Sequence, residues 1–228
     1  MLPSSVPRRS FVARLAAGSA ALGAVFGGTA MFGAAAAFPD IASAASPGEE
    51  LDAWFRAMKG PNKVIYDCVS PASGPEGVFF ARNIIKLSAE KLGTKDTELS
   101  VVVSFRHFST PFGYNDDMWA KYPPMAEMLQ VDDPSTKKRA VRNWLLHELV
   151  MGEAGSNLPA LREHGVNFAV CGAATEFIAH QLAGPGGDAK KIESELSANL
   201  IPGARMMPAG VVGIQRAQKA GFAYTYVG

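Results

Sequence analysis

Five short runs with strand character, several of them rich in β-branched residues, alternate with segments of helical periodicity between residues 62 and 228. A β-branched apolar run favours a buried strand, whereas apolar residues spaced three and four apart favour a helix that buries one face. This alternation predicts an α/β domain with a mainly parallel sheet covered by helices on both faces. The predicted strands are 63–69, 98–107, 166–171, 204–207 and 222–227, and the predicted helices are 76–92, 158–164, 173–182, 188–196 and 211–219.

Composition excludes several classes of protein. A chain of 228 residues, 48% hydrophobic and 19% charged, is neither disordered nor collagenous nor a polytopic membrane protein. Lys and Arg number 22 against 21 Asp and Glu, a net charge of +1, so no nucleic-acid partner is expected. The two cysteines form no CxxC pair, which excludes a disulfide scaffold, a zinc ribbon and a thioredoxin-type site.

Residues 1–44 have the layout of an export signal. Arg8 and Arg9 precede Phe11, a weakly apolar run rich in Gly and Ala reaches Ala37, and residues 42–44 form a small-residue cleavage site. The paired arginines resemble a twin-arginine signal, so we expect cleavage after Ala44, export to the periplasm and no stable membrane span afterwards. The alternative is an uncleaved anchor, because residues 15–37 are long enough to cross a bilayer of about 30 Å.

Residues 45–61 are expected to form a linker or N-terminal helix, and residues 62–228 the domain. The segment 108–155 is too long for a plain crossover and is typical of a lid or contact surface. Asn115 or Asp116 can cap a short helix within it. That helix begins a stripe more typical of a core or subunit interface than of a cofactor pocket, made of Met118, Trp119, Tyr122, Met125 and Met128.

Four chemically reactive side chains lie at the predicted carboxyl ends of strands. Cys68 ends the first strand, Arg106 and His107 end the second, and Cys171 ends the third. Right-handed crossovers bring the carboxyl ends of parallel strands to one edge, where doubly wound proteins bind ligands. We therefore expect these side chains to face one rim.

Cys171 is the leading candidate for a functional thiol. It is followed directly by a helix that opens at Gly172, so its sulfur is expected near unpaired backbone N–H groups and the positive end of a helix dipole, which favour the thiolate. The alternative is that Cys171 packs as a small hydrophobe. Cys68 shares its strand phase with Val64 and Tyr66, which indicates an ordinary buried face.

A disulfide between the two cysteines is not expected. Consecutive strands usually lie side by side, so the second strand separates the first from the third by about 10 Å, and a disulfide needs less than about 7 Å. A different strand order would allow the bond.

His107 can orient or deprotonate a neighbouring thiol, or ligate a metal with it. Alternatively, His107 or Arg106 caps backbone carbonyls and holds the loop. One histidine and one or two cysteines make a poor metal site, so no metal is expected. No nucleotide or other cofactor signature is present, and the Gly-rich segments 70–77 and 184–187 are expected to be turns. A structural role is expected for the other histidines and a solvated basic patch for residues 137–142.

Two segments resemble the DsrE/DsrF/YchN-like family. Residues 166–174, Val-Asn-Phe-Ala-Val-Cys-Gly-Ala-Ala, resemble its strand ending in Cys, and residues 204–224 resemble its Pro-x-Gly-Val turn and C-terminal Gly-aromatic-x-Tyr strand. The likeness covers residues 62–228, and residues 106–119 resemble an exported subgroup with twin-arginine signals.

The resemblance implies a five-stranded, three-layer α/β/α fold, a homo-oligomer such as a trimer or hexamer, and a cysteine that carries sulfane sulfur in a relay. Cys171 occupies that position, with Arg106 and His107 expected nearby and a sulfur-donor or acceptor protein as partner. The relay members are cytoplasmic, whereas this chain is expected to be exported. The alternatives are a non-catalytic binding or assembly subunit that uses residues 108–155, and a carrier of a small ligand or metallocofactor.

Overall fold

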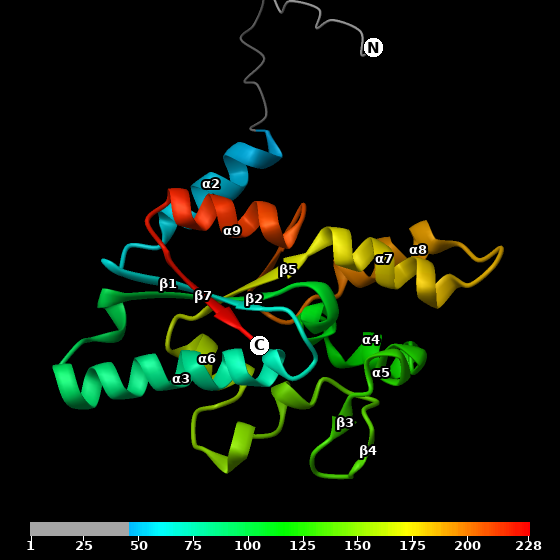
Figure 1. Cartoon of the computed structure of the whole chain (residues 1–228), viewed down its shortest axis with the longest axis horizontal. Coiled ribbons are helices and arrows are strands. Elements are labelled where there is room, and N and C mark those ends of the chain that lie inside the picture. The colour runs from blue at the N-terminus through cyan, green and yellow to red at the C-terminus, as the bar shows by residue number, and fades with distance from the viewer. Residues whose placement is uncertain (1–45) are drawn as a thin grey trace, which may run out of the picture. The chain divides into compact units, whose positions relative to one another are not determined.

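The computed structural model describes residues 46–228 (Figure 1). The predicted export signal and its cleavage site lie outside the described residues. The description begins with helix α2, Pro47–Ala57, where Ser46 and Glu49 form a reciprocal capping box that satisfies N–H groups at the start of the helix. Among residues 46–228, no helix is both long enough and apolar enough to span a bilayer.

Five parallel strands form one sheet in the order β6-β5-β2-β1-β7. Helices cover both faces of this sheet, so the predicted three-layer α/β/α fold with a parallel five-stranded sheet is confirmed (Figure 1). β2 lies between the first and third strands of the prediction, as expected. The strands are β1 (Asn62–Cys68), β2 (Leu99–Phe105), β5 (Asn167–Cys171), β6 (Ala204–Met207) and β7 (Ala223–Val227).

α2 and α9 (Gly210–Lys219) cover one face of the sheet, and α3 (Ser73–Leu92) and α6 (Leu158–Glu163) cover the other (Figure 1). α7 (Gly172–Ala183) and α8 (Ala189–Ala198) pack against each other beyond the carboxyl end of β5. The insertion adds α4 (Asp116–Lys121), α5 (Pro124–Leu129) and the hairpin of β3 (Asp132–Asp133) and β4 (Lys138–Arg139). Short 3-10 segments occupy Asp96–Glu98, His107–Gly113, Trp144–Leu146 and Val150–Gly152.

The strand pleat divides the core into two clusters. Val64, Tyr66 and Cys68 of β1 point toward α3, whereas Ile65 belongs to the smaller cluster under α2 and α9. Side chains of a β-strand alternate between the two faces of the sheet, so neighbours in the sequence enter different clusters. This alternation decides which residues at the carboxyl edge meet.

α3 begins at Ser73, three residues before its predicted start, so residues 73–77 are helical and the predicted turn over 70–77 is wrong there. The Ser73 hydroxyl accepts hydrogen bonds from the N–H groups of Val69 and Ser70, both at 2.7 Å, and thereby joins β1 to the helix. Gly77 is required for close packing rather than for turning, because a Cβ there would lie 2.2 Å from the Cys68 sulfur. Residues 184–187 do connect α7 to α8, as predicted.

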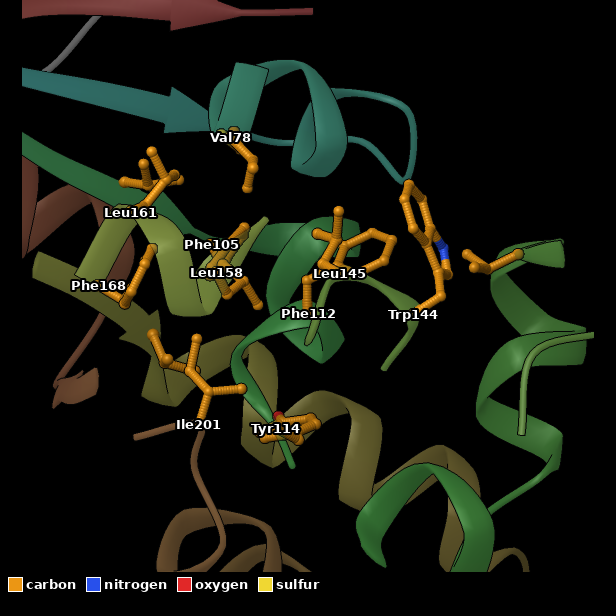
Figure 2. Close-up of a cluster of buried hydrophobic side chains, with 14 of the residues drawn as sticks. Val78, Phe105, Phe112, Tyr114, Trp144, Leu145, Leu158, Leu161, Phe168 and Ile201 are labelled. Atoms are coloured by element: carbon orange, nitrogen blue, oxygen red, sulfur yellow. The ribbon is translucent and has the colours of Figure 1, made fainter. Parts of the chain in front are cut away.

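The insertion is part of the core. Figure 2 shows Phe112, Tyr114 and Leu145 of this segment packed with Phe105 and Phe168 of the sheet, and all five are buried. The predicted helix is present as α4 and is capped by Asn115, whose Oδ1 accepts from the N–H of Met118.

The predicted stripe is mostly core. Met118, Trp119 and Met125 are buried, and Trp119 Nε1–H donates to the carbonyl of Pro111 at 2.9 Å. Tyr122 donates to Glu195, and Met128 is exposed. Trp119 is therefore not available as part of a contact surface, because it is fully buried and its ring packs against Phe112.

We expect Gly77→Ala to lower the free energy of unfolding by about 1–3 kcal/mol, because the new methyl group collides with the Cys68 sulfur. In a Cys68→Ala background the collision disappears, and the better helix propensity of alanine makes the same change neutral or stabilising. Urea unfolding of the four proteins of this cycle measures the coupling. An equal cost in both backgrounds would contradict the predicted contact.

Candidate functional site

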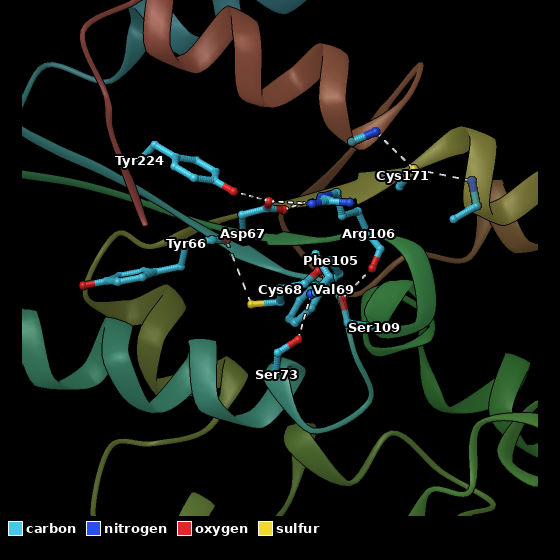
Figure 3. A network of polar contacts seen from close by, with 12 residues as sticks. Tyr66, Asp67, Cys68, Val69, Ser73, Phe105, Arg106, Ser109, Cys171 and Tyr224 are labelled. Carbon is cyan, nitrogen blue, oxygen red and sulfur yellow. Dashed lines mark hydrogen bonds and ion pairs between the residues drawn. The ribbon is translucent and has the colours of Figure 1, made fainter. Parts of the chain in front are cut away.

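The Cys171 sulfur lies at the beginning of two helices. Cys171 ends β5 and caps α7, so its Sγ accepts from the N–H of Ala174 at 3.4 Å. The Gly210 N–H at the start of α9 also points to the sulfur, at 3.1 Å (Figure 3). Both donors and both helix dipoles complement negative charge on sulfur, which is the nucleophilic form. The contact with α7 agrees with the prediction, and the contact with α9 adds a second donor.

A pocket of about 340 Å³ opens beside this sulfur. It brings together the three predicted site residues, Cys171, Arg106 and His107. Cys171 is 6% exposed, so its sulfur is at the buried end of the pocket. The remaining lining residues are Phe108, Ala173, Ala174, Phe177, Ala209, Gly210 and Val211.

The sheet register places Arg106 next to Cys171. Phe105 pairs with Val170, so the next residues along the two strands, Arg106 and Cys171, lie at the same level of the sheet edge. The aliphatic stem of Arg106 packs against Gly210, where a Cβ would lie 2.5 Å from the Arg106 Cβ. Gly210 therefore serves the site twice, by admitting Arg106 and by donating to the sulfur.

Asp67 fixes the guanidinium of Arg106. Arg106 Nε and Nη2 donate to the two carboxylate oxygens at 2.6 and 2.8 Å, and Tyr224 Oη–H donates to the same carboxylate at 2.9 Å (Figure 3). The Asp67 side chain is 2% exposed, and an ion pair this buried requires both partners and good hydrogen-bond geometry. The hydrogen bond to Asp67 raises the pKa of Arg106, whereas burial and then the bond to Asp67 raise that of Tyr224. Arg106 is thus held in place as a charge-compensated cation.

Cys68 does not face the pocket, contrary to the expectation that all four side chains share one rim. The pleat directs its side chain to the α3 face, where its sulfur packs against Gly77. Burial raises the pKa of the Cys68 thiol, and the carboxylates of Asp67 and Glu76 add to this effect. Both cysteines are free thiols. Cys68 is therefore a core residue, in agreement with its predicted strand phase.

His107 lines the pocket from an exposed position directly after β2. Its φ of 54° lies in the left-handed region, which is uncommon for a residue other than glycine, and its ring centroid lies 4.1 Å from that of Phe108. A sparsely populated backbone conformation of this kind is often found at functional sites.

Two of the histidines that were predicted to be structural have local partners. His147 contacts Asp116 at 2.6 Å and His164 contacts Asp96 at 2.7 Å. In the basic segment 137–142, both arginines are paired with acidic groups, and Arg142, for example, binds Asp133 at 2.8 Å. Within residues 46–228, no group of three or more His, Cys, Asp or Glu side chains is arranged to hold a metal ion.

Comparison of the chain with protein-family models, with curated proteins and with solved structures finds no match. The functional interpretation therefore rests on the residues and geometry of the site itself.

Sequence reasoning missed several parts of this site. Asp67 carried a usable signal, because a carboxylate inside an apolar strand must find a cation or hydrogen-bond donors when buried. Tyr224 and Phe177 carried no such signal. Their contribution depends on how strands and helices distant in the sequence are placed around β5.

We expect iodoacetamide to alkylate Cys171 in the folded protein, while Cys68 reacts only after unfolding. Cys171 borders a pocket, whereas Cys68 is fully buried and its pKa is raised. Mass spectrometry of peptides from native and denatured samples identifies the modified residue. In the folded state, a Cys171→Ser protein should take up no label, and label on Cys68 under those conditions would contradict the structure.

Asp67→Asn should lower the free energy of unfolding by about 2–4 kcal/mol, because it leaves the half-buried Arg106 without its carboxylate. Denaturant unfolding measures this loss. The matched control is Glu90→Gln, which removes an exposed i,i+4 pair with Lys86 and should change stability by less than about 0.5 kcal/mol. Similar values for the two variants would show that the buried pair contributes no more than a surface pair.

Proposed function

We propose that this chain is an exported DsrE-like protein that accepts sulfane sulfur on Cys171 and passes it to an acceptor thiol. The observation that carries the proposal is the position of the Cys171 sulfur, which accepts hydrogen bonds from the beginnings of α7 and α9 and borders a pocket. A thiolate stabilised by backbone donors next to a ligand-sized space is the arrangement that nucleophilic sulfur chemistry requires.

The transfer needs no external oxidant or reductant. The Cys171 thiolate attacks the terminal sulfur of a donor persulfide, R–S–SH, and a new S–S bond forms on Cys171. The S–S bond of the donor breaks, and its electron pair leaves with R–S⁻, which takes up one proton to become R–SH. An acceptor thiolate then attacks the terminal sulfur on Cys171 and regenerates the free cysteine. The overall exchange is therefore redox-neutral.

The neighbouring groups have distinct roles in this proposal. The two backbone N–H donors hold the sulfur and stabilise its negative charge. Arg106, whose charge is compensated by Asp67, forms one wall of the pocket. His107 also lines the pocket, and its imidazole can carry the proton from the Cys171 thiol to the leaving thiolate.

The cellular setting belongs to the same proposal. The twin-arginine pattern supports export to the periplasm, and the family resemblance supports a homo-oligomer, such as a trimer or hexamer, with a sulfur-donor or acceptor protein as partner. A protein exported in folded form can receive its sulfur before or after it crosses the membrane.

A second candidate is a non-catalytic binding or assembly subunit. The observation that favours it is the exposure of large apolar side chains on the insertion, since Val141 is 60% and Met151 81% exposed. These residues, and not Trp119, would form the contact surface. The double change of Val141 and Met151 to Ser separates the candidates, because it breaks the assembly in the second candidate and leaves sulfur loading of Cys171 intact in the first.

Anaerobic treatment of the reduced protein with inorganic polysulfide should add the mass of one sulfur atom, located on Cys171. Intact-mass and peptide mass spectrometry measure the gain, and cyanide, which removes sulfane sulfur, should reverse it. Cys171→Ser should abolish the gain, whereas the matched Cys68→Ser control should retain it. Absence of the added sulfur from the wild-type protein, or its persistence in Cys171→Ser, would refute the proposed function.

A further inference from the structure

We infer that the pocket beside Cys171 selects persulfides whose sulfur is attached to an uncharged, apolar organic group. This inference rests on the proposed function and specifies its substrate class. Three observations support it: the apolar lining of the pocket, the exposure of large apolar side chains in that lining, and the pairing of the Arg106 cation with Asp67.

The lining of the pocket is predominantly apolar. Of the ten residues that border the space, only Arg106, His107 and Cys171 carry polar or titratable side chains. The volume of about 340 Å³ falls in the range of small-molecule sites and exceeds what a sulfur atom or an inorganic sulfur anion requires. The surplus space is therefore suited to the carbon skeleton of a donor.

The degree of exposure changes across the pocket. Cys171 is 6% exposed, whereas Phe108 is 38%, Phe177 is 48% and Val211 is 64% exposed. These three large apolar side chains come from the 3-10 segment after β2, from α7 and from α9, and all three line the same pocket. A gathering of exposed apolar side chains around a concavity is typical of a ligand-binding site. A donor whose sulfur reaches Cys171 would cover these side chains with its organic group.

The charge balance disfavours small inorganic anions. The guanidinium of Arg106 is paired in bidentate fashion with Asp67, whose carboxylate also accepts from Tyr224. The fixed charge of the Arg106 and Asp67 pair is zero, so a doubly charged anion such as thiosulfate would lose its hydration without a matching net positive charge. An uncharged organic group has no such penalty and gains from covering Phe108 and Phe177.

The test compares two organic donors that differ in their carbon part, benzyl persulfide and glutathione persulfide. The rate of sulfur addition to Cys171 is followed by intact mass, and each rate is divided by the rate of the same donor with the unfolded chain, which removes differences in intrinsic reactivity. We expect the corrected rate to be about tenfold or more higher for benzyl persulfide, as burial of one ring predicts.

Phe177→Ala should reduce this preference to less than about threefold, because it removes an aromatic side chain from the pocket lining while alanine preserves helix α7. The matched control is Phe80→Ala, since Phe80 is 39% exposed on α3 and is not part of the pocket lining. The control should keep the full preference. Circular dichroism of both variants reports whether the fold is retained.

The outcomes separate the two proposals. Equal corrected rates for the two donors, or an unchanged preference in Phe177→Ala, would overturn the inference about the substrate class while sulfur loading of Cys171 stands. Failure of every donor, inorganic polysulfide included, to load Cys171 would overturn the proposed function and the inference together. Binding of benzyl methyl sulfide to Cys171→Ser, measured by shifts of its aromatic NMR signals, tests the apolar pocket without the reaction. Absence of such binding would also overturn the inference.

Discussion

Side chains that follow one another on a β-strand point to opposite faces of the sheet, and this constraint arranges the whole carboxyl edge of the protein. Asp67 and Cys68 are neighbours in the sequence, yet the carboxylate meets Arg106 on the α9 face and the thiol packs under α3. Cys171 leaves β5 toward the helix that begins at Gly210. The pleat thus separates a thiol that belongs to the core from a thiol that borders a pocket.

The ion pair of Asp67 and Arg106 connects the stability of the domain to the geometry of the site. A carboxylate that is almost completely buried is tolerated only with strong hydrogen-bond donors, and here Arg106 and Tyr224 supply three of them. The same bonds fix the arginine against Gly210, whose N–H contacts the Cys171 sulfur. Strands β1, β2 and β7 therefore support a site that is centred on β5.

The helices and strands of the domain were largely predictable from the sequence, whereas the packing contacts around some of them were not. The alternation of strand-like runs with helical spacing located all five strands within a few residues of their observed bounds. The start of α3 was missed because Gly74 and Gly77 are typical of turns, but here they permit close packing against Phe112 and Cys68. Trp119 was assigned to a stripe that fits a core or an interface, and only its complete burial against Phe112 and Pro111 distinguished the two.

The amino-acid sequence by itself determined the α/β alternation and the position of Cys171 at a strand-to-helix junction, whereas it only favoured an order with β2 between the two cysteines. These properties follow from local periodicity and from the handedness of crossovers, which depend on residues close together in the chain. Only the tertiary structure decided that a second helix donates to the same sulfur, that Asp67 compensates Arg106, and that Phe108, Phe177 and Val211 surround one pocket. These contacts join residues distant in the sequence, and they exist only after the sheet and its covering helices have packed.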